Sequence, residues 1–434
     1  MKWYKQLYIL ALAMLPMLSV AQSQKINSYT FGEGYTFSGG DDYRINLRGY
    51  VQPYYEFKSY TDEDLNGTYQ RFRLRRARLR LTGNAAQQKI DYRFQIDLSG
   101  TSETGDESAG MLMDAWIRYN ATKRIRITVG QKVTPTDNRE LLMGSQMLQL
   151  IERSRVTSSF GSIREFGVFV DGTFRTKNGM YFKPVVAVTN GDGGNVFTAD
   201  HGGLKVGGRL DFLPFGLFTN FGQYRQGDLV RELSPKLVMG VTYSHNMGMS
   251  SRRGRNSGAI LYLDEDGKEA LPDYTKYGFD FMFKFRGFSM LGEFVSASAT
   301  VPDEITQRVR NDGTTSENFE IDGEDNVENY VKNRMMIGQG YNIQMGYIFK
   351  NMVSVDARYC HLSAPDYSFL NNGTFYNRPN YYTLGLTKYF GRSYGFKIQG
   401  SITCVDCADG SNDFNGLEMA GDEWIGRIMT TFSF

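Results

Sequence analysis

The densest group of charged side chains is an arginine run within residues 70–82. Its six arginines alternate with apolar or small residues at a period of two, but the phase changes between Arg75 and Arg76. Successive side chains of a β-strand point to opposite faces, so one face carries all six only if a β-bulge lies at the phase change. A guanidinium group stays charged and presents a planar fork to phosphate or carboxylate. This arginine ladder consists of Arg71, Arg73, Arg75, Arg76, Arg78 and Arg80.

Two roles are open for the arginine ladder. Anion-selective pores are lined by rows of Arg and Lys, so the ladder, together with Arg93, Arg124 and Arg126, is expected to line a pore and guide anions. Alternatively, acidic side chains pair with the arginines and stiffen the wall that carries them. The acids on the polar phase of the neighbouring segments are Asp91, Asp97, Asp114, Asp171, Asp211, Asp280 and Glu293.

Catalytic patterns are weak in this sequence. Its three histidines are His201, His245 and His361, and their Ser and Asp neighbours are of a kind common in any protein. General-base and nucleophile chemistry needs a His in a defined arrangement with its partners. We therefore expect no enzymatic activity and no cofactor.

Metal-binding patterns are weak as well. Cys404 and Cys407 have a metal-like spacing, but there is no second pair and no nearby His. A local disulfide, or a bond from Cys404 to Cys360, is the expected alternative. The acidic loops 264–267 and 322–326 fit solvated loops better than Ca²⁺ sites. We expect no metal site.

The elements that carry these side chains are predicted to be β-strands. Residues 90–98, 277–285 and 341–349 each alternate an apolar with a more polar face at a period of two. Each is close to the ~10 residues that a tilted strand needs to cross a bilayer. About sixteen such strands are expected, starting near Tyr43, Gln70, Gln88, Met111, Lys123, Glu165, Met180, Leu204, Lys236, Thr275, Gly287, Gly338, Met352, Asn380, Tyr394 and Glu423.

The connections between these strands alternate between short and long. Short periplasmic turns and long extracellular loops are typical of outer-membrane barrels, and an even strand count puts both termini in the periplasm. The connection 213–235 breaks the rule, so it is either a periplasmic insertion or a sign of a miscount. The long connections are 58–69, 100–110, 134–163, 190–203, 247–274, 297–337, 363–379 and 406–422.

The connection 134–163 is too apolar for a free surface loop. We expect it to fold into the barrel and narrow the pore, with Arg139, Arg153 and Arg155 at the constriction. An extracellular cap or a short helix packed on the rim is the alternative.

The two ends of the sequence are consistent with export to the outer membrane. Lys2 and Lys5 precede an apolar run over 7–20, and small residues before Gln22 form a cleavage site. The run is short for a transmembrane anchor. The predicted organisation is a signal peptide at 1–21, a periplasmic N-terminal segment at 22–42 and a β-barrel at 43–434.

The last strand alternates apolar residues and ends on Phe434, which resembles the signal by which barrel proteins are recognised for insertion. No apolar stretch of membrane-spanning length follows residue 21, and aromatic residues reach 14%. A net charge of +2 argues against nucleic acid as a partner. A soluble β-sandwich or propeller would share the alternation. The signal, the terminal Phe, the loop rhythm and the aromatic content together favour a membrane barrel.

Several motifs along the chain match one known family, and they lie at 39–49, 72–79, 91–98, 113–116, 130–135, 151–154, 164–167, 208–214 and 292–294. On these motifs the sequence resembles the phosphate- and polyphosphate-selective porins, the O and P porins. The resemblance implies a sixteen-stranded barrel, usually trimeric, with an inward loop and an arginine ladder that guides anions. The sequence departs from it at 133–163, where phosphate-binding members carry lysine clusters and this chain has no Lys.

The expected function is passive diffusion of small hydrophilic solutes, with a preference for anions, through an outer-membrane porin. The expected partners are outer-membrane lipid and lipopolysaccharide, small anionic or polar solutes, and two further copies in a homotrimer. The alternative is a barrel subunit that scaffolds a larger outer-membrane complex without transport of its own.

Overall fold

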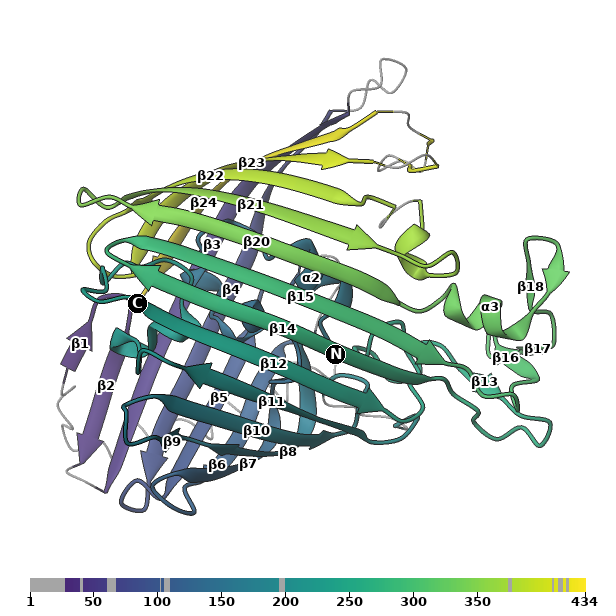
Figure 1. The fold of residues 1–434 in the computed structure, drawn as a ribbon, viewed down its shortest axis with the longest axis horizontal. Coiled ribbons are helices and arrows are strands. Elements are labelled where there is room, and N and C mark those ends of the chain that lie inside the picture. The colour runs from purple at the N-terminus through teal and green to yellow at the C-terminus, as the bar shows by residue number, and fades with distance from the viewer. Residues whose placement is uncertain are drawn as a thin grey trace, which may run out of the picture.

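A closed ring of antiparallel strands forms the body of the protein (Figure 1). The computed structural model describes residues 28–39, 42–60, 68–101, 103–104, 110–194, 200–373, 377–407, 410–412, 417–418 and 421–434. The sixteen strands of the ring are β3 (Tyr43–Tyr60), β4 (Tyr69–Ala85), β5 (Ile90–Asp97), β6 (Leu112–Tyr119), β7 (Ile125–Val133), β8 (Arg164–Gly172), β10 (Tyr181–Thr189), β11 (Lys205–Leu213), β12 (Lys236–Asn246), β14 (Asp273–Phe285), β15 (Phe288–Thr300), β20 (Gly338–Ile348), β21 (Val353–Ser363), β22 (Asn380–Tyr389), β23 (Phe396–Asp406) and β24 (Glu423–Ser433).

The ring confirms the prediction of an antiparallel barrel of about sixteen strands, and each strand begins within two residues of its predicted start. Each strand pairs with the next along the chain, and β24 pairs with β3 to close the ring. A short strand, β9 (Phe174–Arg175), continues β8 along β10. Outward side chains are mainly apolar, as in Phe72, Ile117 and Leu384, whereas inward ones are mainly polar.

The phase change in the arginine run is a β-bulge. Opposite β3, the register passes from Gln52 facing Arg76 to Pro53 facing Leu74, so Arg75 has no counterpart. The extra residue confirms the predicted slip and turns both halves of the ladder to the inner face.

A short hairpin continues the wall beyond the last strand. It consists of β1 (Ser28–Thr30) and β2 (Gly34–Gly39), which were not among the predicted strands. β2 pairs with the first residues of β3, whereas β24 pairs with β3 from Tyr50 onward. At the junction, the backbones of Gly49 and Phe434 exchange two hydrogen bonds of 2.9 Å. β3 is therefore the one strand shared by the ring and the hairpin.

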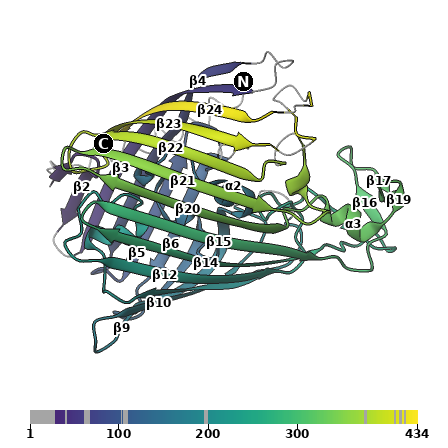
Figure 2. The same cartoon turned by 45° about the horizontal axis from the view of Figure 1, so that its top comes forward.

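The two ends of the barrel differ, as Figure 1 shows. At one end the turns are short, with 86–89, 286–287 and 349–352 as examples. At the other end, connections 247–272 and 301–337 build a module that projects beyond the strands (Figures 1 and 2). Its elements are β13 (Tyr262–Leu263), β16 (Gln307–Val309), β17 (Thr315–Ser316), β18 (Glu320–Ile321), β19 (Glu324–Asp325) and α3 (Val327–Lys332).

The projecting module has an apolar core in which Phe319, Tyr330 and Met336 are buried. A short turn, η4 (Phe369–Asn371), packs against the same core. Among the helices in the described parts of the chain, none has the length and apolarity needed to span a bilayer.

Two connections enter the barrel. Residues 134–163, the inward segment, contain η1 (Arg139–Leu142), η2 (Ser145–Met147) and α2 (Arg155–Phe160) and are largely buried within the ring (Figure 2). The prediction of a loop folded into the pore is confirmed. Residues 214–235, which join β11 to β12 at the short-turn end, also bury side chains inside and include η3 (Thr219–Tyr224). This long connection is an insertion, and the strand count was correct.

Candidate functional site

The lumen begins at the long-loop end with an arginine pair around one carboxylate. Glu56 on β3 accepts from Arg71 on β4 at 2.8 Å and from Arg427 on β24 at 2.6 Å. The three side chains face one another because their strands are neighbours in the ring. Arg427 was not among the predicted site residues.

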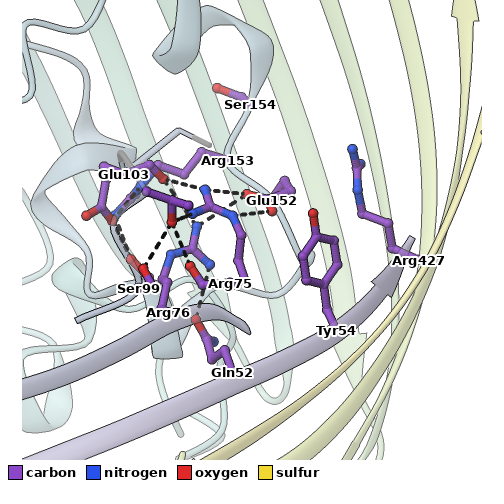
Figure 3. Close-up of polar contacts among 12 residues, drawn as sticks. Gln52, Tyr54, Arg75, Arg76, Ser99, Glu103, Glu152, Arg153, Ser154 and Arg427 are labelled. Atoms are coloured by element: carbon purple, nitrogen blue, oxygen red, sulfur yellow. Dashed lines mark hydrogen bonds and ion pairs between the residues drawn. The ribbon is translucent and has the colours of Figure 1, made fainter. Parts of the chain in front are cut away.

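The middle of the ladder holds the inward segment (Figure 3). The carboxylate of Glu152 accepts two hydrogen bonds from Arg75, at 2.7 and 3.1 Å, and one from Arg76 at 3.3 Å. Burial alone would raise the pKa of Glu152, but the two guanidinium groups outweigh it and bring the pKa to about 2. The carboxylate is thus charged at neutral pH and docks the segment on the wall.

Glu103, from the connection between β5 and β6, is a second docking point (Figure 3). Its carboxylate lies 2.8 Å from Arg78, 2.6 Å from Arg153 and 3.4 Å from Arg164. Burial opposes ionisation, but these arginines hold the pKa of Glu103 well below its usual value. Arg78 also contacts Asp97 at 2.6 Å. Glu103 was not predicted as a site residue, because no local sequence pattern pairs a loop acid with a distant strand.

Arg139 lies fully buried at the start of the inward segment. Its guanidinium contacts Asp211 on β11 at 2.7 Å and Asp280 on β14 at 2.8 Å, and Arg209 contacts both acids as well. This four-residue cluster ties the segment to the wall. Arg139 is enclosed within it, with none of its side chain exposed.

The other predicted arginines are spread along the lumen. Arg80 contacts Gln95 at 2.5 Å and faces Arg48 across the strand pair. Arg93 lies 3.5 Å from Asp114, and Arg126 lies 2.5 Å from Asp171.

Three predicted residues lie apart from these pairs. Arg73 has an inward position between Phe72 and Leu74. Arg124 lies exposed in the turn before β7, outside the ladder. Arg155, at the start of α2, stacks over Tyr381 with its guanidinium carbon 5.6 Å from the ring centroid.

A cavity of about 680 Å³, the vestibule, opens between the inward segment and the long loops. Ten basic and three acidic side chains line it. Arg252 and Arg253 reach it from the connection 247–272, Arg378 from the connection before β22, and Arg358 and Arg427 from the wall. The basic run at 252–255 is the sequence signal for the first two. The basic lining residues are Lys58, Arg71, Arg75, Arg153, Arg155, Arg252, Arg253, Arg358, Arg378 and Arg427, and the acidic ones are Glu56, Glu152 and Glu423.

A smaller cavity of about 100 Å³ lies near the short-turn end. Four cations and one acid line it: Arg48, Arg225, Lys284 and Arg392, with Glu33. The described lumen therefore has an excess of cations at both cavities, while most of the ladder between them is paired with acids.

The cysteine prediction was wrong. Cys360, Cys404 and Cys407 are all free thiols. Cys360 is buried and its thiol donates to the amide oxygen of Asn342 at 3.2 Å. The metal-like spacing of Cys404 and Cys407 comes from the end of β23, where Cys404 lies in the strand and Cys407 just past it.

Comparisons with known proteins agree with this geometry. The sequence model of the phosphate-selective porin O and P family matches residues 45–312. A search of curated proteins found no match. An anion-selective porin from Comamonas acidovorans has a similar fold, with a TM-score of 0.50 at 11% identity over 91% of this chain and 100% of that chain. The outer membrane channel DcaP of Acinetobacter baumannii gives a TM-score of 0.49 at 13% identity over 93% of this chain and 100% of that chain.

Proposed function

Because this chain belongs to the phosphate-selective porin O and P family of outer-membrane porins, we propose that it lets small hydrophilic solutes diffuse through its lumen and favours anions. The family and the barrel fold are those of channels rather than enzymes. The observation that carries the preference for anions is the ten-to-three excess of basic over acidic side chains around the vestibule.

Charge at the mouth of a narrow opening acts on every solute that enters. A cleft lined by one sign of charge, with low-dielectric walls, concentrates the opposite ion. Four of the predicted arginines line the vestibule: Arg71, Arg75, Arg153 and Arg155. Arg75, Arg76, Arg78 and Arg153 also dock the inward segment, since Glu152 and Glu103 pair with them. The arginine-lined lumen thus combines both roles that were open from the sequence.

We also propose the placement of the chain in the membrane. Residues 1–21 act as a signal peptide, 22–42 lie in the periplasm and 43–434 form the barrel. The long connections face the outside and the short turns face the periplasm, as is usual for these barrels. Both termini are then periplasmic, the outer surface contacts lipid and lipopolysaccharide, and three copies associate as a homotrimer.

Reversal potentials in planar bilayers test the preference for anions. Under a salt gradient, the wild type should reverse toward the anion equilibrium potential. The double variant Arg155→Gln/Arg252→Gln removes two vestibule charges and should shift the reversal potential toward zero. The shift should shrink in 1 M salt, where the Debye length falls to about 3 Å.

The control carries the same charge change on the exposed loops. Lys268→Gln/Arg310→Gln removes two cations outside the vestibule, because Lys268 and Arg310 lie exposed on the projecting module. This variant should keep the wild-type reversal potential. Reversal at zero or toward the cation potential in the wild type would refute the preference for anions.

A scaffolding role is the second candidate. It is favoured by the two connections, 134–163 and 214–235, that occupy much of the lumen. A barrel that conducts no ions and co-purifies with other outer-membrane subunits would support scaffolding over diffusion.

A further inference from the structure

The connection 214–235 enters the lumen from the end at which the turns are otherwise short. It leaves the wall after β11 and returns at β12. Several of its side chains are buried, and Gln223, Gln226 and Asp228 have 1% exposure or less. A periplasmic turn needs only a few residues to link two neighbouring strands. The burial of these side chains inside the barrel therefore indicates a role other than linking β11 to β12.

The connection contacts the wall beside its own strands and also the wall farther round the ring. The ammonium of Lys284 on β14 donates to the carbonyls of Gly222 and Gly227, each at 2.9 Å. Tyr394, between β22 and β23, donates to Gly227 at 3.2 Å. β22 is six places from β11 around the ring. The connection therefore crosses the bore instead of following the wall.

Apolar packing fixes the far side of the connection. Leu229 packs with Ile348 at the end of β20 and with Tyr389 on β22. On the near side, Asp228 accepts from the backbone nitrogen of Gly287, between β14 and β15, at 2.7 Å. Contacts at both sides of the bore hold the connection as a strap.

Gln226 joins this strap to the inward segment. Its side-chain oxygen accepts from the backbone of Gln149 at 2.8 Å and from Gln344 on β20 at 3.0 Å. Its side-chain nitrogen donates to Glu140 at 2.9 Å. All four side chains are at least nine-tenths buried. Two chain segments from opposite ends of the barrel thus meet at Gln226.

The cavities on the two sides of this contact differ in size. The vestibule measures about 680 Å³, whereas the cavity at the strap measures about 100 Å³. Seven of the residues that line the smaller cavity belong to the strap, and Gln146 and Met147 of the inward segment also line it. The smaller of the two cavities therefore lies where the strap is.

From these contacts we infer that residues 214–235 form a second constriction that limits the size of solute that passes, and that Gln226 is the positioning residue that holds this strap against the inward segment. The inference rests on the proposed diffusion of solutes, but it concerns size rather than charge. The vestibule admits solutes that the contact between the strap and the inward segment then excludes.

Two variants test the inference in planar bilayers. Gln226→Ala removes three side-chain hydrogen bonds and should raise the largest polyethylene glycol that enters the pore. A shortened variant, in which Asn-Gly replaces residues 217–233, should raise single-channel conductance on the order of two-fold or more, since the narrowest section limits flow. Leu233→Ala is the matched control, because Leu233 belongs to the same connection and is 88% exposed.

Folding is checked by the heat-dependent shift of the barrel band in gel electrophoresis. The inference is overturned if both variants fold and keep the wild-type conductance and polyethylene glycol limit. If the wild type does not conduct, a conducting shortened variant supports the strap as the barrier, and a silent one overturns it. Failure of the preference for anions would show in the reversal potential and leave these size measurements unaffected.

Discussion

Glu152 comes from the inward segment, yet its two oxygens contact Arg75 and Arg76 on the barrel wall. Glu103 likewise joins Arg78 of the wall to Arg153 of the segment. Buried ions are costly unless they are paired. At the scale of the residue, these acids therefore stabilise the buried arginines of the ladder and also hold the inward segment against the wall.

We predict that Glu152→Gln loosens the inward segment. The change leaves Arg75 and Arg76 buried without their shared carboxylate, and breaking one partner of a buried pair costs about 3–5 kcal/mol. The midpoint of thermal unfolding in detergent should fall, and open-channel noise should rise. Glu317→Gln, on an exposed part of the projecting module, is the control and should leave both unchanged.

The same carboxylate gives a pH dependence with a defined sign. The pKa of Glu152 is lowered from 4.5 to about 2, so its contribution to stability is complete above about pH 4.5 and is lost as the pH falls toward 2. The difference in unfolding midpoint between wild type and Glu152→Gln should be constant from pH 8 to 5 and should close below. A constant difference down to pH 2 would contradict the assigned pKa.

At the scale of the element, the bulge at Arg75 keeps arginines off the lipid-facing side. Phe72 and Leu74 face outward before the bulge and Leu79 faces outward after it. Without the extra residue, one half of the run would turn its arginines outward. The bulge also places Arg75 next to Glu152, so a change of register and a docking contact occur at one residue.

Two single-residue deletions separate these effects. Deleting Arg75 restores strict alternation with Leu74 outward and Arg76 inward, so the barrel should still assemble. Deleting Leu74 instead sends Arg75 toward lipid, which costs roughly 2–4 kcal/mol near the bilayer centre. The yield of heat-modifiable barrel in outer-membrane fractions measures the difference. Equal yields would mean that the strand shifts its register elsewhere.

The strands were predictable and the interior contacts were not. Alternation located every strand of the ring, since lipid and water select opposite side-chain types at a period of two. β5 begins two residues after the predicted start at Gln88, because residues 86–88 form a turn with positive φ, which alternation does not specify. Asp97 and Asp280 were predicted as partners of the arginines because they lie on the polar phase of their strands. Glu103, Glu152 and Gln226 were missed because their partners lie 25 to 118 residues away.

At the scale of the whole molecule, the ring depends on its last strand. β24 covers one edge of β3 and one edge of β23. A variant that ends before residue 423 should therefore yield no heat-modifiable barrel, because two open edges would remain. A variant without residues 28–39 loses only the hairpin, which lies outside the ring, and should still form the barrel. The gel shift of membrane fractions distinguishes the two.

The pairing of β3 with both β2 and β24 has a consequence for the time course of assembly. β3 is the first strand of the ring to be synthesised and its neighbour β24 is the last, so one edge of β3 lacks its partner while more than 350 residues follow. Exposed strand edges invite aggregation. β2 can cover only the first residues of that edge, so the rest stays unpaired until β24 is available.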